Sequence, residues 1–82
     1  MDPIGIRIET GKYNKPITII EGVSSRFNIK EIKKELIKSI GCGGSINGDI
    51  IQLQGDHFDR VYSFFIGKGL KHENIKLLFV IR

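Results

Sequence analysis

The chain has 82 residues, a formal net charge of +4 and a single cysteine, Cys42. This length allows one modest hydrophobic core, so residues 1–82 are expected to form a single domain. A lone cysteine excludes an internal disulfide and favours a reducing, cytoplasmic setting, and no metal or cofactor is expected. Neither a membrane-spanning run nor a signal peptide is expected. The basic excess favours a polyanionic partner.

Residues 4–21 are predicted to form a β-hairpin. Isoleucines alternate with glycine or charged residues over "IGIRIE", which is the period of a half-buried strand. The polar stretch "TGKYNK" follows as a turn, and Pro16 opens a second strand over residues 17–21.

The stretch "NIKEIKKELIKSIG", residues 28–41, is predicted to form an amphipathic helix. Asn28 followed by Glu31 is typical of a capping box, and Gly41 suits a helix end. Five apolar residues are expected on its core-facing side: Ile29, Ile32, Leu36, Ile37 and Ile40.

The second half is predicted to contain a hairpin, a helix and a final strand. "SINGDIIQL" (45–53) is expected to turn at Asn47-Gly48 in type I′ geometry. The next helix is expected over residues 58–66, with Asp56 as its cap and glycines 67 and 69 at its end. "NIKLLFVIR" (74–82) alternates as the last strand, with Ile75, Leu77, Phe79 and Ile81 on one side. The helix over residues 58–66 should turn four residues to the core: Val61, Tyr62, Phe65 and Ile66.

The resulting order β-β-α-β-β-α-β predicts an α/β (α+β) fold, a two-layer sandwich with two helices on one face of a five-stranded mixed sheet. An RNA-recognition motif would place stacking aromatic residues on the helix-free face. None is expected there, and the apolar members of this face leave a protein partner open. The residues expected on it are Arg7, Thr18, Ile20, Gln52, Gln54, Lys76, Leu78 and Val80.

Two stretches resemble catalytic or nucleotide-binding motifs only superficially. In "GCGGSING" the glycines follow a helix and precede a strand, whereas a dinucleotide fingerprint requires the reverse. In "DHFD", Asp56, His57 and Asp59 could serve a small hydrolase, but capping and the helix dipole account for both aspartates. We therefore expect no enzyme activity and no catalytic residue.

The lysines carry a stronger signal. Lys30, Lys34 and Lys38 recur at i, i+4 spacing along the first helix, with Lys33 beside them. Like charges at this spacing destabilise an isolated helix slightly, so the row either is a solvated face or contacts phosphates. In the first turn, three residues could contact phosphate and base: Lys12, Tyr13 and Lys15.

Taken together, "IRIE" before a basic hairpin, "GCGGSI", "IIQLQGD" and the later "GL" resemble the small translation initiation factor 1 family of eukaryotes and archaea. The resemblance runs from Ile6 to about Leu77. It implies binding to the small ribosomal subunit (rRNA) beside the P site, close to initiator tRNA and mRNA, where the factor supports scanning and start-codon selection. A monomer without cofactor, which also meets other initiation factors, is implied.

By position in the family, the basic first hairpin with Lys12, Tyr13 and Lys15 and the helix lysines 30, 33, 34 and 38 would contact RNA. Asn47 and Gly48 would form a shortened turn near initiator tRNA. The family motif itself would be structural, with "IIQLQGD" as the hinge that fixes the second helix against the sheet. Its residues are Gly43, Gly44, Gln54, Gly55 and Asp56.

Some positions depart from the family. Only residues 1–3 precede the first strand, where eukaryotic members have a long tail that meets other factors. Phe58 and Asp59 stand where a basic residue is usual, so an RNA contact at this helix start is not expected. The alternative function is a non-ribosomal protein-interaction module that retains the fold and works through the sheet face around Ile20 and Leu78.

Overall fold

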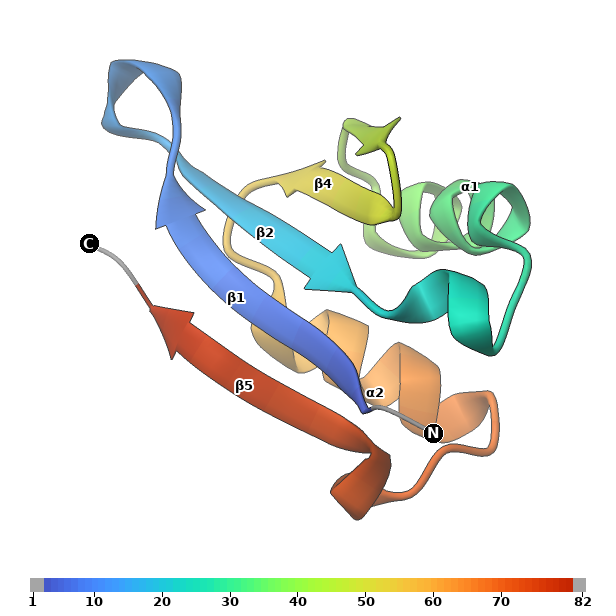
Figure 1. Ribbon diagram of the computed structural model, residues 1–82. Helices are drawn as coiled ribbons and strands as arrows, with labels where there is room; N and C mark the ends of the chain where they lie inside the picture. Colours follow the sequence, from blue (N-terminus) through green and yellow to red (C-terminus); the bar gives the residue numbers. More distant parts are fainter. Residues whose placement is uncertain (1–2, 81–82) are drawn as a thin grey trace.

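Five strands form one mixed sheet, and two helices cover one of its faces (Figure 1). The computed structural model describes residues 3–80 and the side chains of residues 3–78. The predictions for Ile81 and for the side chains of Phe79 and Val80 lie outside this part. The elements are β1 (Ile4–Thr10), β2 (Pro16–Glu21), α1 (Ile29–Ile40), β3 (Gly44–Asn47), β4 (Ile50–Gln54), α2 (Phe58–Gly67) and β5 (Ile75–Val80).

The strand order is β3-β4-β2-β1-β5. Neighbouring strands are antiparallel except β1 and β5, which run parallel and bring the first and last strands side by side. Three short 3-10 turns complete the chain: η1 (Lys12–Asn14), η2 (Val23–Ser25) and η3 (His72–Asn74). The predicted fold class and element order are confirmed.

The core lies between the sheet and the two helices. Ile4 and Ile6 of β1 are fully buried, as are Leu36 of α1 and Phe65 of α2. Phe27, just before α1, packs on Phe65 with ring centroids 6.0 Å apart. The alternation of isoleucines in β1 and the helical spacing of apolar residues in α1 therefore place these side chains in one core.

Helix α1 begins and ends as the sequence predicts. The Asn28 side chain accepts a hydrogen bond from the Glu31 amide at 3.2 Å, and Gly41 adopts a left-handed conformation beyond the last turn. Two of the five expected core residues, Ile32 and Leu36, are buried. The other three are partly buried and pack against the core: Ile29, Ile37 and Ile40.

In strand β2, the side chains that face the helices are the ones that were expected on the open face of the sheet. Ile20 and Thr18 are fully buried on the helix-covered face, whereas both were expected on the open face. Glu21 lies on the open face, where its carboxylate accepts a hydrogen bond from Arg7. In "PITIIE" both faces carry isoleucine, so hydrophobicity alone does not determine which face is buried.

The second hairpin turns one residue later than predicted. Asn47 pairs with Ile50 and still belongs to β3, so Gly48 and Asp49 form the two-residue loop. Gly48 has a φ of 64°, and Asp49 is not among the residues with positive φ. Positive φ at the first central position alone is the pattern of a type II′ turn, and the predicted type I′ turn is wrong.

Helix α2 starts at Phe58 and is preceded by His57, so the prediction that Asp56 caps it is wrong. Val61 and Phe65 are buried as expected, and Tyr62 is half-buried. Ile66 is 38% exposed, contrary to its predicted core position. Two further residues of α2, outside the four expected to face the core, pack against it: Phe58 and Phe64.

Candidate nucleic-acid interface

The three lysines of the predicted row lie on the exposed side of α1. Lys30, Lys34 and Lys38 are all exposed, and none forms an ion pair with another described residue. Glu35, which is spaced to pair with Lys38 at i, i+3, binds elsewhere: Lys68 at the end of α2 lies 2.6 Å from its carboxylate. A row of unpaired ammonium groups at one-turn spacing is what a phosphate-contacting helix requires.

Beside this row runs a shallow groove between α1 and β3. It has a volume of about 420 Å³. Lysine side chains form its rim, while Ile37 and Ile46 form an apolar floor. Ile37 was expected on the core-facing side of the helix, and no site role was predicted for Ile46. The lysines of the rim are Lys30, Lys33 and Lys34.

The β1–β2 loop holds its aromatic residue away from the protein. Tyr13 is 89% exposed and has a φ of 61°, and Asn14 follows with a φ of 57°. The Gly11 amide donates to the Lys15 carbonyl oxygen at 2.6 Å and so closes the loop. Lys12 and Lys15 flank the ring and are both exposed. The expected basic loop with one aromatic residue between two cations is therefore present, and its ring does not pack on the sheet.

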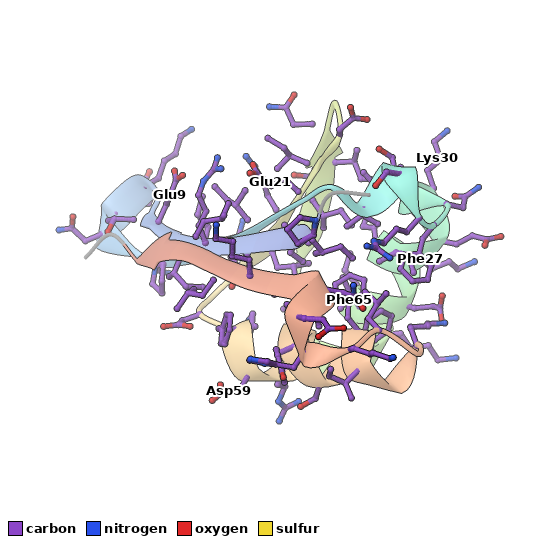
Figure 2. All side chains as sticks on the ribbon, turned by 60° about the horizontal axis from the view of Figure 1, so that its bottom comes forward. Glu9, Glu21, Phe27, Lys30, Asp59 and Phe65 are labelled. Atoms are coloured by element: carbon purple, nitrogen blue, oxygen red, sulfur yellow. The ribbon has the colours of Figure 1, made fainter. Side chains whose placement is uncertain are left out.

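The two basic regions do not form one continuous patch. In Figure 1 the β1–β2 loop projects from one end of the sheet, whereas α1 lies across the other side of the molecule. Figure 2 shows the same separation, with Glu9 near the loop and Lys30 at the far end of the molecule. The two sets of cations can therefore contact different segments of a large polyanion.

The third predicted region, at Asn47 and Gly48, is exposed and short. The carboxylate of the following Asp49 accepts a hydrogen bond from the Ser24 hydroxyl at 3.2 Å, which ties the turn to η2. Residues 44–54 contain no lysine or arginine, so this hairpin offers no cation for RNA binding.

The family motif forms the junction between the sheet and α2. Gly55 has a φ of 103°, and a Cβ at this position would lie 2.5 Å from the His57 ring nitrogen Nε2. The buried Thr18 hydroxyl donates to the Gly55 carbonyl oxygen at 2.7 Å and accepts from the His57 amide at 2.9 Å. The Gly55 amide in turn donates to the Pro16 carbonyl oxygen. This geometry fits the predicted hinge, although Thr18 rather than Asp56 fixes the helix start.

The side chains considered for a hydrolase do lie together. Asp56, His57 and Asp59 line a hollow of about 460 Å³ at the start of α2. The ring of His57 is 2.5 Å from the Gln54 carbonyl oxygen, so its Nε2 serves as a donor to the backbone. The other residues that line this hollow are Ile8, Phe58, Arg60 and Leu77.

Among the described residues, no group of three histidine, cysteine or acidic side chains is placed to hold a metal ion. Burial raises the pKa of the half-buried Cys42 thiol, which disfavours the nucleophilic thiolate. None of the helices in the described part of the chain is long and apolar enough to cross a bilayer.

The open sheet face, which was expected to carry Arg7 among polar and apolar residues, holds a charge cluster around this arginine. Arg7 forms ion pairs with Glu9 and Glu21, the latter at 2.8 Å. The hydrogen bond to Glu9 raises the pKa of the guanidinium. Because Ile20 is in the core, the surface expected for a protein-interaction module, around Ile20 and Leu78, is not formed as predicted.

Comparison of the sequence with known proteins places the chain in a class of translation factors. The family model "Translation initiation factor SUI1" matches residues 1–71. The protein translation factor SUI1 homologue of Sulfolobus acidocaldarius is 38% identical over 76 residues, which is 92% of this chain and 77% of the relative. The Pyrococcus horikoshii homologue is 39% identical over 75 residues, covering 90% and 76%.

The protein therefore belongs to the SUI1 family of translation initiation factors. This confirms the resemblance inferred from "IIQLQGD" and the basic hairpin. Membership supports a role in translation initiation and implies ribosome-related partners.

Proposed function

We propose that the protein binds the small ribosomal subunit beside the P site, supports scanning and disfavours initiation at non-start codons. It acts in the cytoplasm as a monomeric, non-catalytic factor alongside other initiation factors. The observation that carries the RNA-binding part is the row of Lys30, Lys34 and Lys38, which has no ion pair within the described residues. Family membership supports the role in initiation.

The row supports rRNA binding for an electrostatic reason. Each ammonium group that contacts a phosphate releases a condensed counterion, so affinity falls steeply as salt is added. Glu35 would reduce this effect if it paired within α1, but it pairs with Lys68 instead. Lys38 therefore remains exposed without this partner.

Binding of the fluorescently labelled protein to purified small ribosomal subunits, measured at several salt concentrations, tests the proposal. Lys30→Glu/Lys34→Glu should weaken binding strongly and flatten the salt dependence by about one power of salt concentration per lost contact. The matched control is Lys71→Glu/Lys76→Glu, which changes the net charge equally at exposed residues outside α1.

If both double variants lose the same affinity, only net charge matters and the α1 interface is refuted. If the unaltered protein does not bind subunits at all, ribosome binding is refuted. The selection step needs a separate measurement, in which a reconstituted initiation assay compares complex formation at a start codon and a near-start codon. Addition of the protein should lower the near-start signal selectively.

A further inference from the structure

A second groove lies on the open sheet face, beneath the β1–β2 loop. It has a volume of about 530 Å³, within the range of roughly 300–1,000 Å³ typical of small-ligand sites. One wall is the loop with its two lysines and Tyr13, and the other is the exposed side of β4. The residues lining it are Gly11, Lys12, Tyr13, Lys15, Ile17, Gln52 and Gln54.

Two kinds of uncharged group, an aromatic ring and side-chain amides, face this groove. Tyr13 offers an almost fully exposed ring. Gln52 and Gln54 project from the face of β4 opposite the buried Ile51 and Leu53. Their side-chain amides make no hydrogen bond to the described residues. An amide offers both donors and an acceptor, and can therefore pair with the edge of any nucleobase.

The charge of the groove is positive. Lys12 and Lys15 form no ion pair with a described residue. Glu9 lies on the same face, where its strand position pairs with Ile17, and its carboxylate is bound to Arg7. The ammonium groups are thus left for an anionic ligand.

The loop is held in a conformation that costs free energy. Left-handed backbone at a non-glycine residue is unfavourable, and Tyr13 and Asn14 adopt it in succession. The hydrogen bond between Gly11 and Lys15 fixes this arrangement. Exposing a large ring through a strained loop does nothing for the core, but it prepares a platform for stacking.

We propose that this groove binds one unstacked nucleotide of a single-stranded RNA segment. The base stacks on the ring of Tyr13 and hydrogen-bonds to the amides of Gln52 and Gln54. Lys12 and Lys15 contact the flanking phosphates. This inference rests on the proposed function and specifies the RNA feature that the loop recognises, since a base inside a duplex is not accessible for stacking.

Fluorescein-labelled hexauridylate and hexaadenylate, compared with a fully paired G·C-rich RNA duplex that is stable under the same conditions, test the site without ribosomes. Single strands should bind, and duplexes should bind at least tenfold more weakly. Tyr13→Ala should weaken single-strand binding on the order of tenfold, while Tyr13→Phe, which keeps the ring, stays within about twofold. Gln52→Ala/Gln54→Ala should lose several-fold, and Lys71→Glu/Lys76→Glu, at exposed residues outside the groove, should have little effect. The side-chain amide resonances of both glutamines should shift in NMR spectra when a single strand is added.

Unaltered binding by Tyr13→Ala, equal binding of duplexes, or glutamine resonances that do not move at millimolar oligonucleotide would overturn the inference. These failures are distinct from failure of the proposed function. A protein that binds subunits but not single strands refutes the nucleotide groove alone. One that binds single strands as described but not subunits refutes the ribosomal role alone.

Discussion

Lys68, which follows the last residue of α2, binds Glu35 in the middle of α1 at 2.6 Å. The same ammonium lies 5.5 Å from the centre of the Phe64 ring, so it is held from two sides. This contact joins the two helices and removes the one carboxylate that could pair with Lys38 one turn further along α1. The lack of a Glu35 partner at Lys38 thus depends on the residue that follows the other helix.

Replacing Lys68 should therefore weaken RNA binding without touching the row. In Lys68→Ala, Glu35 is free to pair with Lys38 at i, i+3, and such a pair contributes about 0.2–0.5 kcal/mol. We expect subunit affinity to fall roughly twofold beyond the loss seen in Lys71→Ala, which removes the same charge. Adding Glu35→Ala to Lys68→Ala should recover this extra loss of affinity, because Lys38 then has no carboxylate at i−3. The idea fails if Lys68→Ala and Lys71→Ala bind equally.

Thr18→Val should destabilise the protein by about 1–3 kcal/mol, because it leaves the Gly55 carbonyl and the His57 amide without their buried partner. Urea denaturation measures the change. Thr18→Ser, which keeps the hydroxyl, should lose only about 1 kcal/mol for the missing methyl group. Hydrogen exchange at the His57 amide should accelerate in the valine variant only. A valine variant as stable as the natural protein would show that the hydroxyl does not hold the helix start.

The adjacent glycines 43 and 44 should respond differently to alanine. A Cβ on Gly44 would lie 2.8 Å from the Gln52 carbonyl oxygen and 2.9 Å from Leu53 Cδ2. A Cβ on Gly43 would meet only Gln54 Cγ, at 3.5 Å. Gly44→Ala should therefore cost about 1–3 kcal/mol in the free energy of unfolding, and Gly43→Ala much less. Chemical denaturation of both variants checks this, and equal losses would contradict it.

The thiol of Cys42 should react slowly in the folded protein. Its pKa is raised by burial, so the folded state holds the proton to higher pH than the unfolded state does. The corresponding stability is present below the unfolded pKa and is lost as pH rises through the folded pKa. Alkylation by iodoacetamide should reach its plateau rate at higher pH than in urea. A titration that coincides with that of the denatured chain would disprove this expectation.

Local signals determined much of the fold. Asn28 and Gly41 mark the two ends of α1, whose apolar residues follow a clear helical spacing. In β1 the alternation of apolar residues allows only one orientation of the strand. In β2, apolar residues occur on both faces, and the orientation is decided by contacts distant in sequence. Thr18 reaches Gly55, and Glu21 reaches Arg7. A periodic pattern of apolar residues does not predict such partners.

The same distinction applies to the candidate site. Lys30, Lys34 and Lys38 follow from helical spacing alone, and their exposure agrees with it. That Lys38 does not pair with Glu35 depends on Lys68, which approaches only in the folded chain. Tyr13 likewise lies in a loop with left-handed backbone, a conformation that its residue types do not predict.

The parallel pairing of β1 with β5 affects how this chain folds as it is made. Ile4 lies opposite Ile75, so nearly the whole chain must be synthesised before β1 gains its second neighbour. Closing so long a loop is entropically unfavourable and slows the search for the native sheet. Until β5 arrives, one edge of β1 offers unpaired backbone groups to other nascent chains. A premature stop before residue 75 should therefore yield an aggregation-prone polypeptide, even though both helices and most of the core-forming side chains would already be present.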